Sequence, residues 1–92
     1  MIKDFKHKGL KQFFLYGSVA GINIEHSNKI RLRLAVIDSA AQVNDINRPG
    51  YNLHQLKGNK LGYWSIVVTG NWRITFRFED GNAYIVNYED YH

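Results

Sequence analysis

The clearest pattern in the chain is a strict alternation of apolar and polar residues in the stretch WRITFRFE, from Trp72 to Glu79. Successive side chains of a strand point to opposite faces of its sheet, so this alternation predicts a strand with one apolar face. The apolar side comprises Trp72, Ile74, Phe76 and Phe78, and the polar side comprises Arg73, Thr75, Arg77 and Glu79. Apolar stretches flank this strand, and turn signals at Gly70-Asn71 and Asp80-Gly81 separate the three segments, which predicts antiparallel hairpins.

The first half of the chain has helical spacing instead. A short helix is predicted from Leu10, Phe13 and Phe14, with Gly17 as its stop, and a longer one over about 26–41 from Ile30, Leu34, Ile37 and Ala41. Residues 1–6 predict a short first strand, and residues 53–58 predict another after the polar loop that contains Pro49-Gly50.

This element order predicts an α+β fold over residues 1–92 as a single domain. We expect one N-terminal strand, two helices, and an antiparallel meander of about four strands whose apolar face lies under the helices. The opposite face would then carry Arg73 and Arg77 into solvent. A twisted sheet is concave somewhere, so a polar concave face with arginines is a candidate site for a phosphate backbone.

Composition narrows the class of protein. The 92 residues are 45% hydrophobic and 14% aromatic, which favours a packed globule over disorder. Cysteine is absent, so disulfides and thiolate metal sites are excluded. No apolar run has the length of a membrane span, and the charged N-terminal stretch lacks the apolar segment of a signal peptide. We therefore expect a soluble, cytoplasmic protein.

The distribution of charged residues along the chain suggests a class of binding partner. The net charge is +4, and it is concentrated in residues 1–37, where seven basic residues face two acidic ones. A basic half favours a polyanion such as nucleic acid, although a charge of this size also serves solubility alone.

Two of the four histidines lie among reactive residue types. His54 precedes Lys57 in LHQLKG, and His92 follows Asp90 and Tyr91 in EDYH. His7 and His26, near helix starts, are expected to be ordinary surface residues. A metal-free ribonuclease needs a base for the 2′-hydroxyl, an acid for the 5′-oxygen and cations for the phosphorane charge.

Histidine suits the acid and base roles, and the cationic side chains of Lys57 and Arg73 suit the third. Asp90 could orient or tune an imidazole. Each of these residues also has a plainer interpretation as a solvated surface group, and His54, His92 and Asp90 could instead form a two-histidine, one-carboxylate metal site.

The stretches MIKDFKHKGLKQFF, LHQLKGNKLGYWSIVVTGNWRITFRFEDG and NYEDYH together resemble the HigB group of RelE-like toxins, also called the plasmid maintenance killer family. The resemblance implies a RelE-like microbial ribonuclease fold. It also implies ribosome-dependent cleavage of mRNA in the A site, by 2′-hydroxyl attack and without a cofactor. Gln55 departs from the proline that many relatives carry there, which could shift His54 slightly.

The resemblance places catalytic roles on His54, Lys57, Arg73, Asp90, Tyr91 and His92. It leaves open whether His54 or His92 is the base and whether the other or Tyr91 is the acid. The expected contacts with ribosomal RNA and mRNA come from Lys3, Lys6, Lys8, Lys11, Lys29, Arg31, Arg33 and Arg77. The implied partners are the ribosome and a HigA-like helix-turn-helix antitoxin, through which alone the toxin would meet operator DNA. The alternatives are a non-catalytic nucleic-acid-binding module, an antitoxin-bound co-repressor and a ribosome-independent ribonuclease.

Overall fold

The computed structural model describes residues 1–91; His92 lies outside the described residues. In chain order the elements are α1 (Lys8–Tyr16), η1 (Ile24–His26), α2 (Ser27–Ser39), η2 (Val43–Ile46), β1 (His54–Gln55), η3 (Gly58–Lys60), β2 (Tyr63–Thr69), β3 (Trp72–Glu79) and β4 (Asn82–Asp90), where η marks a 3-10 helix. Over these residues the strands form one antiparallel sheet in the order β1-β2-β3-β4. The α+β prediction is confirmed.

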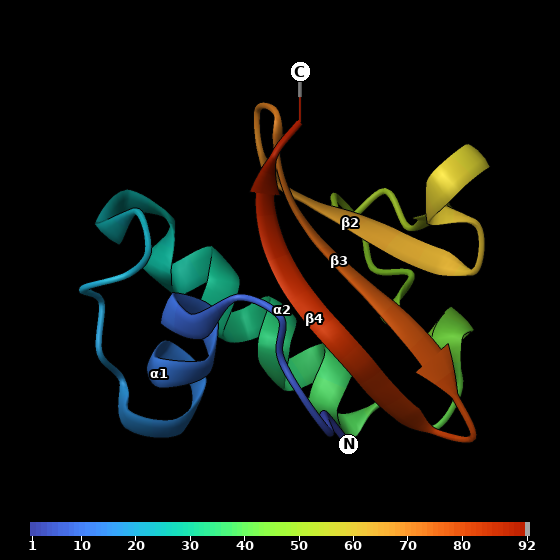
Figure 1. The fold of residues 1–92 in the computed structure, drawn as a ribbon, viewed down its shortest axis with the longest axis horizontal. Coiled ribbons are helices and arrows are strands. Elements are labelled where there is room, and N and C mark those ends of the chain that lie inside the picture. Colours follow the sequence, from blue (N-terminus) through green and yellow to red (C-terminus); the bar gives the residue numbers. More distant parts are fainter. Residues whose placement is uncertain (92) are drawn as a thin grey trace.

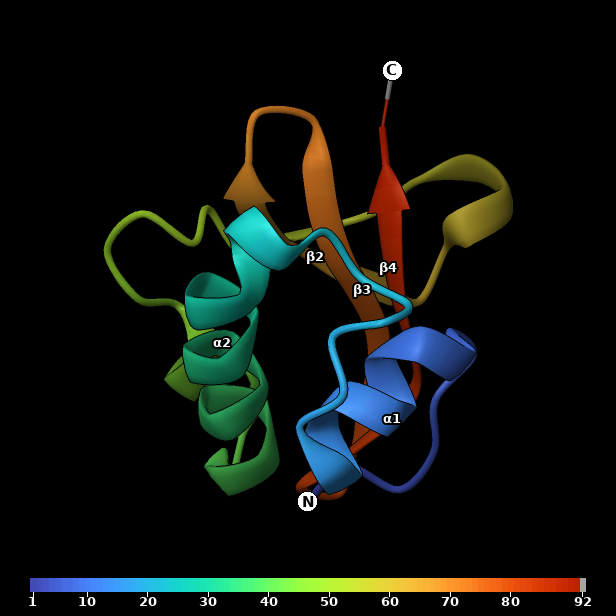
Figure 2. The same ribbon diagram turned by 90° about the vertical axis from the view of Figure 1, so that its left-hand side faces the viewer.

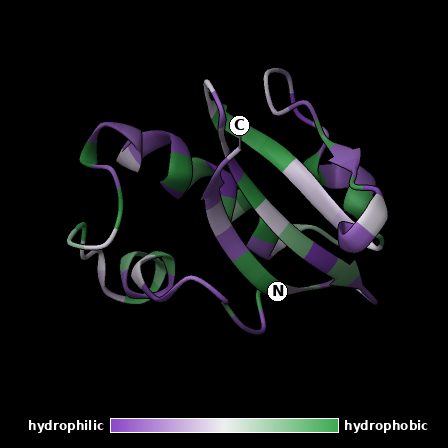
Figure 3. Cartoon of the chain, turned by 45° about the horizontal axis from the view of Figure 1, so that its top comes forward, coloured by the Kyte–Doolittle hydropathy of each residue, from purple (hydrophilic) through white to green (hydrophobic). Residues whose placement is uncertain are grey.

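Helices and sheet form two layers. Figure 2 shows α1 and α2 side by side over one face of the sheet, and Figure 1 shows the segment that carries η3 on the other side. The core between the layers contains Leu10, Ile30, Leu34, Ile37, Ile66, Ile74, Phe76 and Val86, all at most 1% exposed. Hydrophobic and hydrophilic segments alternate along the strands in Figure 3, as a sheet covered on one face requires.

The hairpin between β3 and β4 turns at Asp80 and Gly81, whose φ values are 52° and 79°. Two successive positive φ angles match the right-handed twist of the strands, so the predicted turn is confirmed. Further along, the register shifts between Thr75 and Arg77, because β4 contains one extra residue there. Ile85, with φ 55°, lies in this β-bulge.

The predicted N-terminal strand is wrong in extent. Residues 1–7 run beside β4, but the pairing is reduced to two isolated parallel bridges, Ile2 with Ala83 and Phe5 with Val86. The bulge interrupts the ladder between them. There the Asp4 carboxylate, instead of a backbone carbonyl, accepts the hydrogen bond from the Ile85 N–H.

The two predicted helices are present with adjusted ends. The His7 side chain caps α1 by accepting from the Leu10 N–H, and Gly17 ends it in the left-handed region at φ 75°. The second helix, α2, ends at Ser39, two residues early, so Ala40 is buried in place of the predicted Ala41. Within residues 1–91, no helix combines the length and apolar composition needed to cross a membrane.

Candidate functional site

The polar face of the sheet is organised in rows across the strands. Directly paired residues of antiparallel strands project to the same side, so the register assigns each residue to a face. One row comprises His54, Ser65, Thr75 and Asn87; the next comprises Val67, Arg73 and Glu89; the third comprises Tyr63, Arg77 and Tyr84. The alternation predicts that Arg73 and Arg77 share one face, and the register adds His54 to that face.

His54 is exposed, and its ring is held by the turn before it. Asn52 lies in the left-handed region at φ 51°, and its carbonyl oxygen is 2.9 Å from His54 Nδ1. A carbonyl oxygen can only accept, so Nδ1 carries the hydrogen and donates it. In the neutral ring Nε2 is then the unprotonated nitrogen. The backbone therefore selects the tautomer whose outer nitrogen can take a proton.

Arg73 lies half-buried in the row next to His54. Its Cζ is 5.7 Å from the centre of the Tyr91 ring, and its buried Nη1 has no hydrogen-bond partner among residues 1–91. Strand spacing and residue rise put the Cα atoms of His54 and Arg73 roughly 12 Å apart. Two long side chains can span that distance to one phosphate. An unpaired buried donor on a cation is costly, so this guanidinium favours an anion.

Sequence reasoning missed two hydroxyls between these residues. Ser65 and Thr75 are 0% and 1% exposed although both lie on the polar face. Thr75 Oγ1 donates to Glu89 Oε1 at 3.0 Å, whereas Ser65 Oγ has no partner among the described residues. The alternation alone predicts exposed polar residues here.

The remaining predicted catalytic residues are less closely grouped. Lys57 is exposed just before η3, on the segment that leaves β1. Asp90 pairs with Trp72, so the pleat places it on the opposite side from Arg73, Glu89 and Tyr91. His92 lies outside the described residues, and so does any metal site or imidazole contact that depends on it. The three residues placed together on the polar face are His54, Arg73 and Tyr91.

His26 is not the surface residue that the sequence predicts. It is 7% exposed, and its Nδ1 lies 2.6 Å from the hydroxyl oxygen of Tyr88. Tyr88 also stacks on Trp72, with ring centres 4.6 Å apart, and touches the edge of His7. Burial raises the pKa of the Tyr88 phenol, which outweighs the lowering by a hydrogen bond with the Asn23 backbone, and the Asp90 carboxylate raises it slightly further. This aromatic cluster lies on the helix side, at the end of β4.

Most of the basic residues predicted to bind RNA are exposed. These are Lys3, Lys6, Lys8, Lys11, Lys29, Arg31 and Arg77. Arg33 is the exception, and its predicted role is corrected. It is 8% exposed, its Nε donates to the Val67 carbonyl at 2.7 Å, and its guanidinium lies 4.3 Å from the centre of the Tyr51 ring. Desolvation lowers its pKa. Arg33 joins α2 to β2 and is unavailable to RNA.

Comparison with known proteins decides the family. Residues 3–92 match the family model described as HigB-like toxin, the RelE-like toxin of the type II toxin–antitoxin system HigB. The chain belongs to this family. It is 54% identical over 92 residues to "Endoribonuclease HigB" of Proteus vulgaris, covering all of both chains. It is 32% identical over 87 residues to "Toxin HigB-1" of Vibrio cholerae serotype O1, covering 90% of each.

A solved structure agrees with the fold of this HigB-type toxin. The match is to a chain of the "YoeB-YefM complex from Staphylococcus aureus", with a TM-score of 0.62 and 22% identity, over 100% of this chain and 93% of that chain. At this identity the likeness supports the fold alone. As a toxin of a type II toxin–antitoxin system, the protein has an antitoxin partner.

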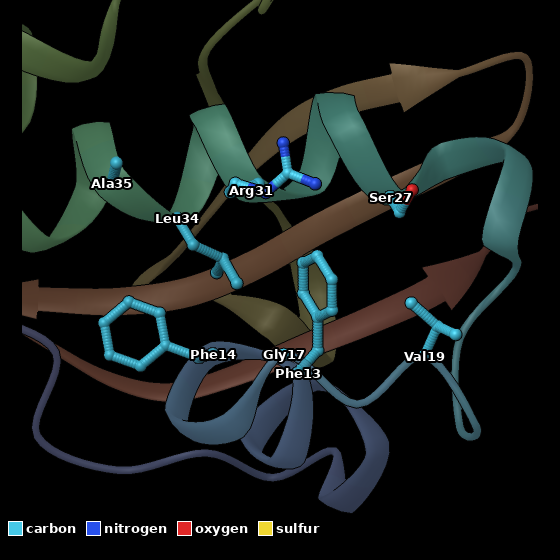
Figure 4. Close-up of a pocket in the computed structure, with 8 residues that line it drawn as sticks. All are labelled: Phe13, Phe14, Gly17, Val19, Ser27, Arg31, Leu34 and Ala35. Atoms are coloured by element: carbon cyan, nitrogen blue, oxygen red, sulfur yellow. The ribbon is translucent and has the colours of Figure 1, made fainter.

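The toxin also has a groove on its helix side. It encloses about 400 Å³ and is lined by Phe13, Phe14, Gly17, Val19, Ser27, Arg31, Leu34 and Ala35. Figure 4 shows that these residues come from α1, α2 and the segment between them. The groove contains none of the polar-face residues. Separately, within residues 1–91 no three His, Asp or Glu side chains are grouped so that they could hold a metal ion.

Proposed function

We propose that this HigB-type toxin is an endoribonuclease that cleaves mRNA in the ribosomal A site and thereby inhibits translation. The observation that carries the proposal is the 54% identity, over the whole chain, to a protein named an endoribonuclease. The polar face supports it, because one side of the sheet carries a candidate base, His54, and an arginine, Arg73, whose Nη1 has no hydrogen-bond partner among the described residues. The proposed dependence on the ribosome comes from the resemblance of the sequence motifs to the HigB group of toxins.

The proposed reaction is a 2′-hydroxyl attack on the adjacent phosphorus. His54 Nε2 takes the proton, the 2′-oxygen bonds to phosphorus, and the bond from phosphorus to the 5′-oxygen breaks. Tyr91 or His92 gives a proton to that oxygen, which leaves a 2′,3′-cyclic phosphate and a 5′-hydroxyl. The hydrogen bond from His54 to Asn52 favours His54 as the base, since it leaves the outer nitrogen unprotonated.

Arg73 and Lys57 stabilise the negative charge of the transition state in this mechanism. Arg73 is suited to the task because its half-buried guanidinium lies on the same face as His54 and offers the forked donors that fit a phosphate. We propose Asp90 as the residue that orients His92. It cannot orient His54 in the same way, because its pairing with Trp72 places it on the opposite face of the sheet. All these groups belong to the chain itself, and the mechanism requires no metal ion.

The exposed lysines supply the proposed contact with the ribosome. Lys3, Lys6, Lys8 and Lys11 precede or lie on α1, and Lys29 and Arg31 lie on α2. Contacts of this kind go to phosphates, are blind to sequence and weaken with salt. We propose a HigA-like helix-turn-helix antitoxin as the partner that restrains the toxin.

The test is primer extension on mRNA bound to purified ribosomes, with naked mRNA as the parallel reaction. The intact chain should cleave only on ribosomes. His54→Ala and deletion of His92 should each lower the rate by about 10²-fold or more, the usual worth of one acid or base.

The matched control is Gln55→Ala, because Gln55 belongs to the same two-residue strand but pairs with Trp64 on the other face. It should cleave like the intact chain. Cleavage of naked RNA would refute ribosome dependence. Absence of cleavage in every reaction would favour the co-repressor and binding-module alternatives instead.

A further inference from the structure

Arg73 and Glu89 face each other directly across β3 and β4. Opposite charges at directly paired positions of a sheet normally attract and stabilise the pairing. Within residues 1–91, however, no ion pair joins these two side chains, and Arg73 Nη1 is left without any hydrogen-bond partner. The arrangement therefore needs an explanation, because the guanidinium has an obvious carboxylate beside it.

The explanation lies one row away. Thr75 Oγ1 donates a hydrogen bond to Glu89 Oε1 at 3.0 Å. Thr75 pairs with Asn87, so Glu89 is its diagonal neighbour on the same face. Thr75 is 1% exposed, which fixes its hydroxyl and shields this hydrogen bond from competition by water. The carboxylate is thus drawn along the sheet toward the Thr75 row.

We propose that Thr75 is a positioning residue for RNA cleavage, because its hydroxyl holds the Glu89 carboxylate away from Arg73 and keeps the guanidinium available to the RNA phosphate. The inference rests on the proposed role of Arg73. A carboxylate that paired with Arg73 in the bidentate manner would compete for the same donors that a phosphate uses. Thr75 removes this internal competitor without removing its charge from the protein.

Three variants isolate the effect. Thr75→Val keeps the branched shape and removes the hydroxyl, so Glu89 is free to pair with Arg73. Ribosomal cleavage should fall by about tenfold in kcat/KM, the factor that corresponds to the loss of one hydrogen bond to a charged group. Thr75→Ser keeps the hydroxyl and should restore cleavage. The double variant Thr75→Val/Glu89→Gln removes the competing charge and should recover it too.

A second measurement follows Arg73 directly, without activity. The Arg73 Nε–H resonance is followed by NMR during titration with inorganic phosphate. Its shift should saturate at lower phosphate in the intact chain, in Thr75→Ser and in the double variant than in Thr75→Val. Raised salt should weaken phosphate binding in all four proteins but preserve their order. Equal urea midpoints for Thr75→Val and the double variant would separate positioning from folding.

The two measurements distinguish two failures. Equal cleavage and equal phosphate titration in Thr75→Val and the intact chain would overturn the positioning role. So would a double variant that stays as impaired as Thr75→Val, since Glu89 would then not be the cause. If Arg73→Ala cleaves normally while the phosphate titrations keep the expected order, the positioning role stands and the proposed catalytic role of Arg73 fails.

Discussion

Removal of the Tyr88 hydroxyl should destabilise the toxin without disturbing its packing. Tyr88→Phe keeps the ring that stacks on Trp72 at 4.6 Å and keeps the burial of a residue that is 5% exposed. It removes the hydroxyl that lies 2.6 Å from His26 Nδ1 and that also interacts with the backbone of Asn23. Burial raises the pKa of the Tyr88 phenol, so the hydroxyl keeps its hydrogen throughout the neutral range.

The expected loss follows from the burial of both partners. His26 is 7% exposed, so water cannot replace the hydroxyl. A buried polar group left without a partner costs about 1–3 kcal/mol. For a domain of this size, each kcal/mol lowers Tm by about 4–8 °C. Replacing both partners by apolar groups is far less costly, so His26→Leu/Tyr88→Phe should be more stable than the sum of its single variants predicts.

Urea unfolding at pH 7.5, followed by tryptophan fluorescence and by circular dichroism, gives the free energies. Tyr84→Phe is the matched control, because Tyr84 lies on β4 and its hydroxyl makes no hydrogen bond within the described residues. It should unfold within about 0.5 kcal/mol of the intact chain. A Tyr88→Phe variant as stable as Tyr84→Phe would refute the reasoning, and so would strictly additive effects in the double variant.

Three further predictions test other parts of the structure. Arg33→Lys should lose about 1–2 kcal/mol in urea unfolding, because lysine cannot reproduce the Nε hydrogen bond or the stacking on Tyr51, whereas Arg31→Lys should be neutral. Burial lowers the pKa of His7 below 6.5, so the intact chain should lose more stability than His7→Asn as pH falls from 7.5 to 5, since the unfolded chain takes up the proton first; equal losses would contradict this. Gly9→Ala should lose about 1–3 kcal/mol, because the new Cβ would lie 2.5 Å from the Gly21 carbonyl oxygen, and unchanged unfolding would show that the two segments can separate.

The strands were predictable because their signals are local. Alternation from Trp72 to Glu79 and the Asp80-Gly81 turn depend on neighbours in sequence, and both are confirmed. Family membership was equally readable from the motifs. Arg33 was not predictable, since helical spacing placed it off the apolar stripe. Its burial depends on a carbonyl of β2 and on Tyr51, which reach it only in the folded chain.

The candidate site was predictable by residue type but not by arrangement. The pleat of β3 already places Arg73 and Thr75 on one face. What it cannot give is their partner on β4, because that depends on the register between the strands. Counting back from the turn without interruption pairs Arg73 with Tyr88. The structure pairs it with Glu89, one residue further along.

The bulge at Ile85 makes this difference, and it links the fold to the site. A shift of one residue moves every later side chain of a strand to the opposite face. With the bulge, Val86 and Tyr88 enter the core, and Glu89 and Tyr91 reach the face of Arg73.

Without the bulge, Val86 and Tyr88 would lie on the face of Arg73, and Glu89 and Tyr91 would lie on the core side of the sheet. Its extra N–H needs an acceptor, and the Asp4 carboxylate supplies it. The N-terminal segment therefore satisfies the one backbone irregularity that brings the phenol of Tyr91 and the carboxylate of Glu89 to the arginine.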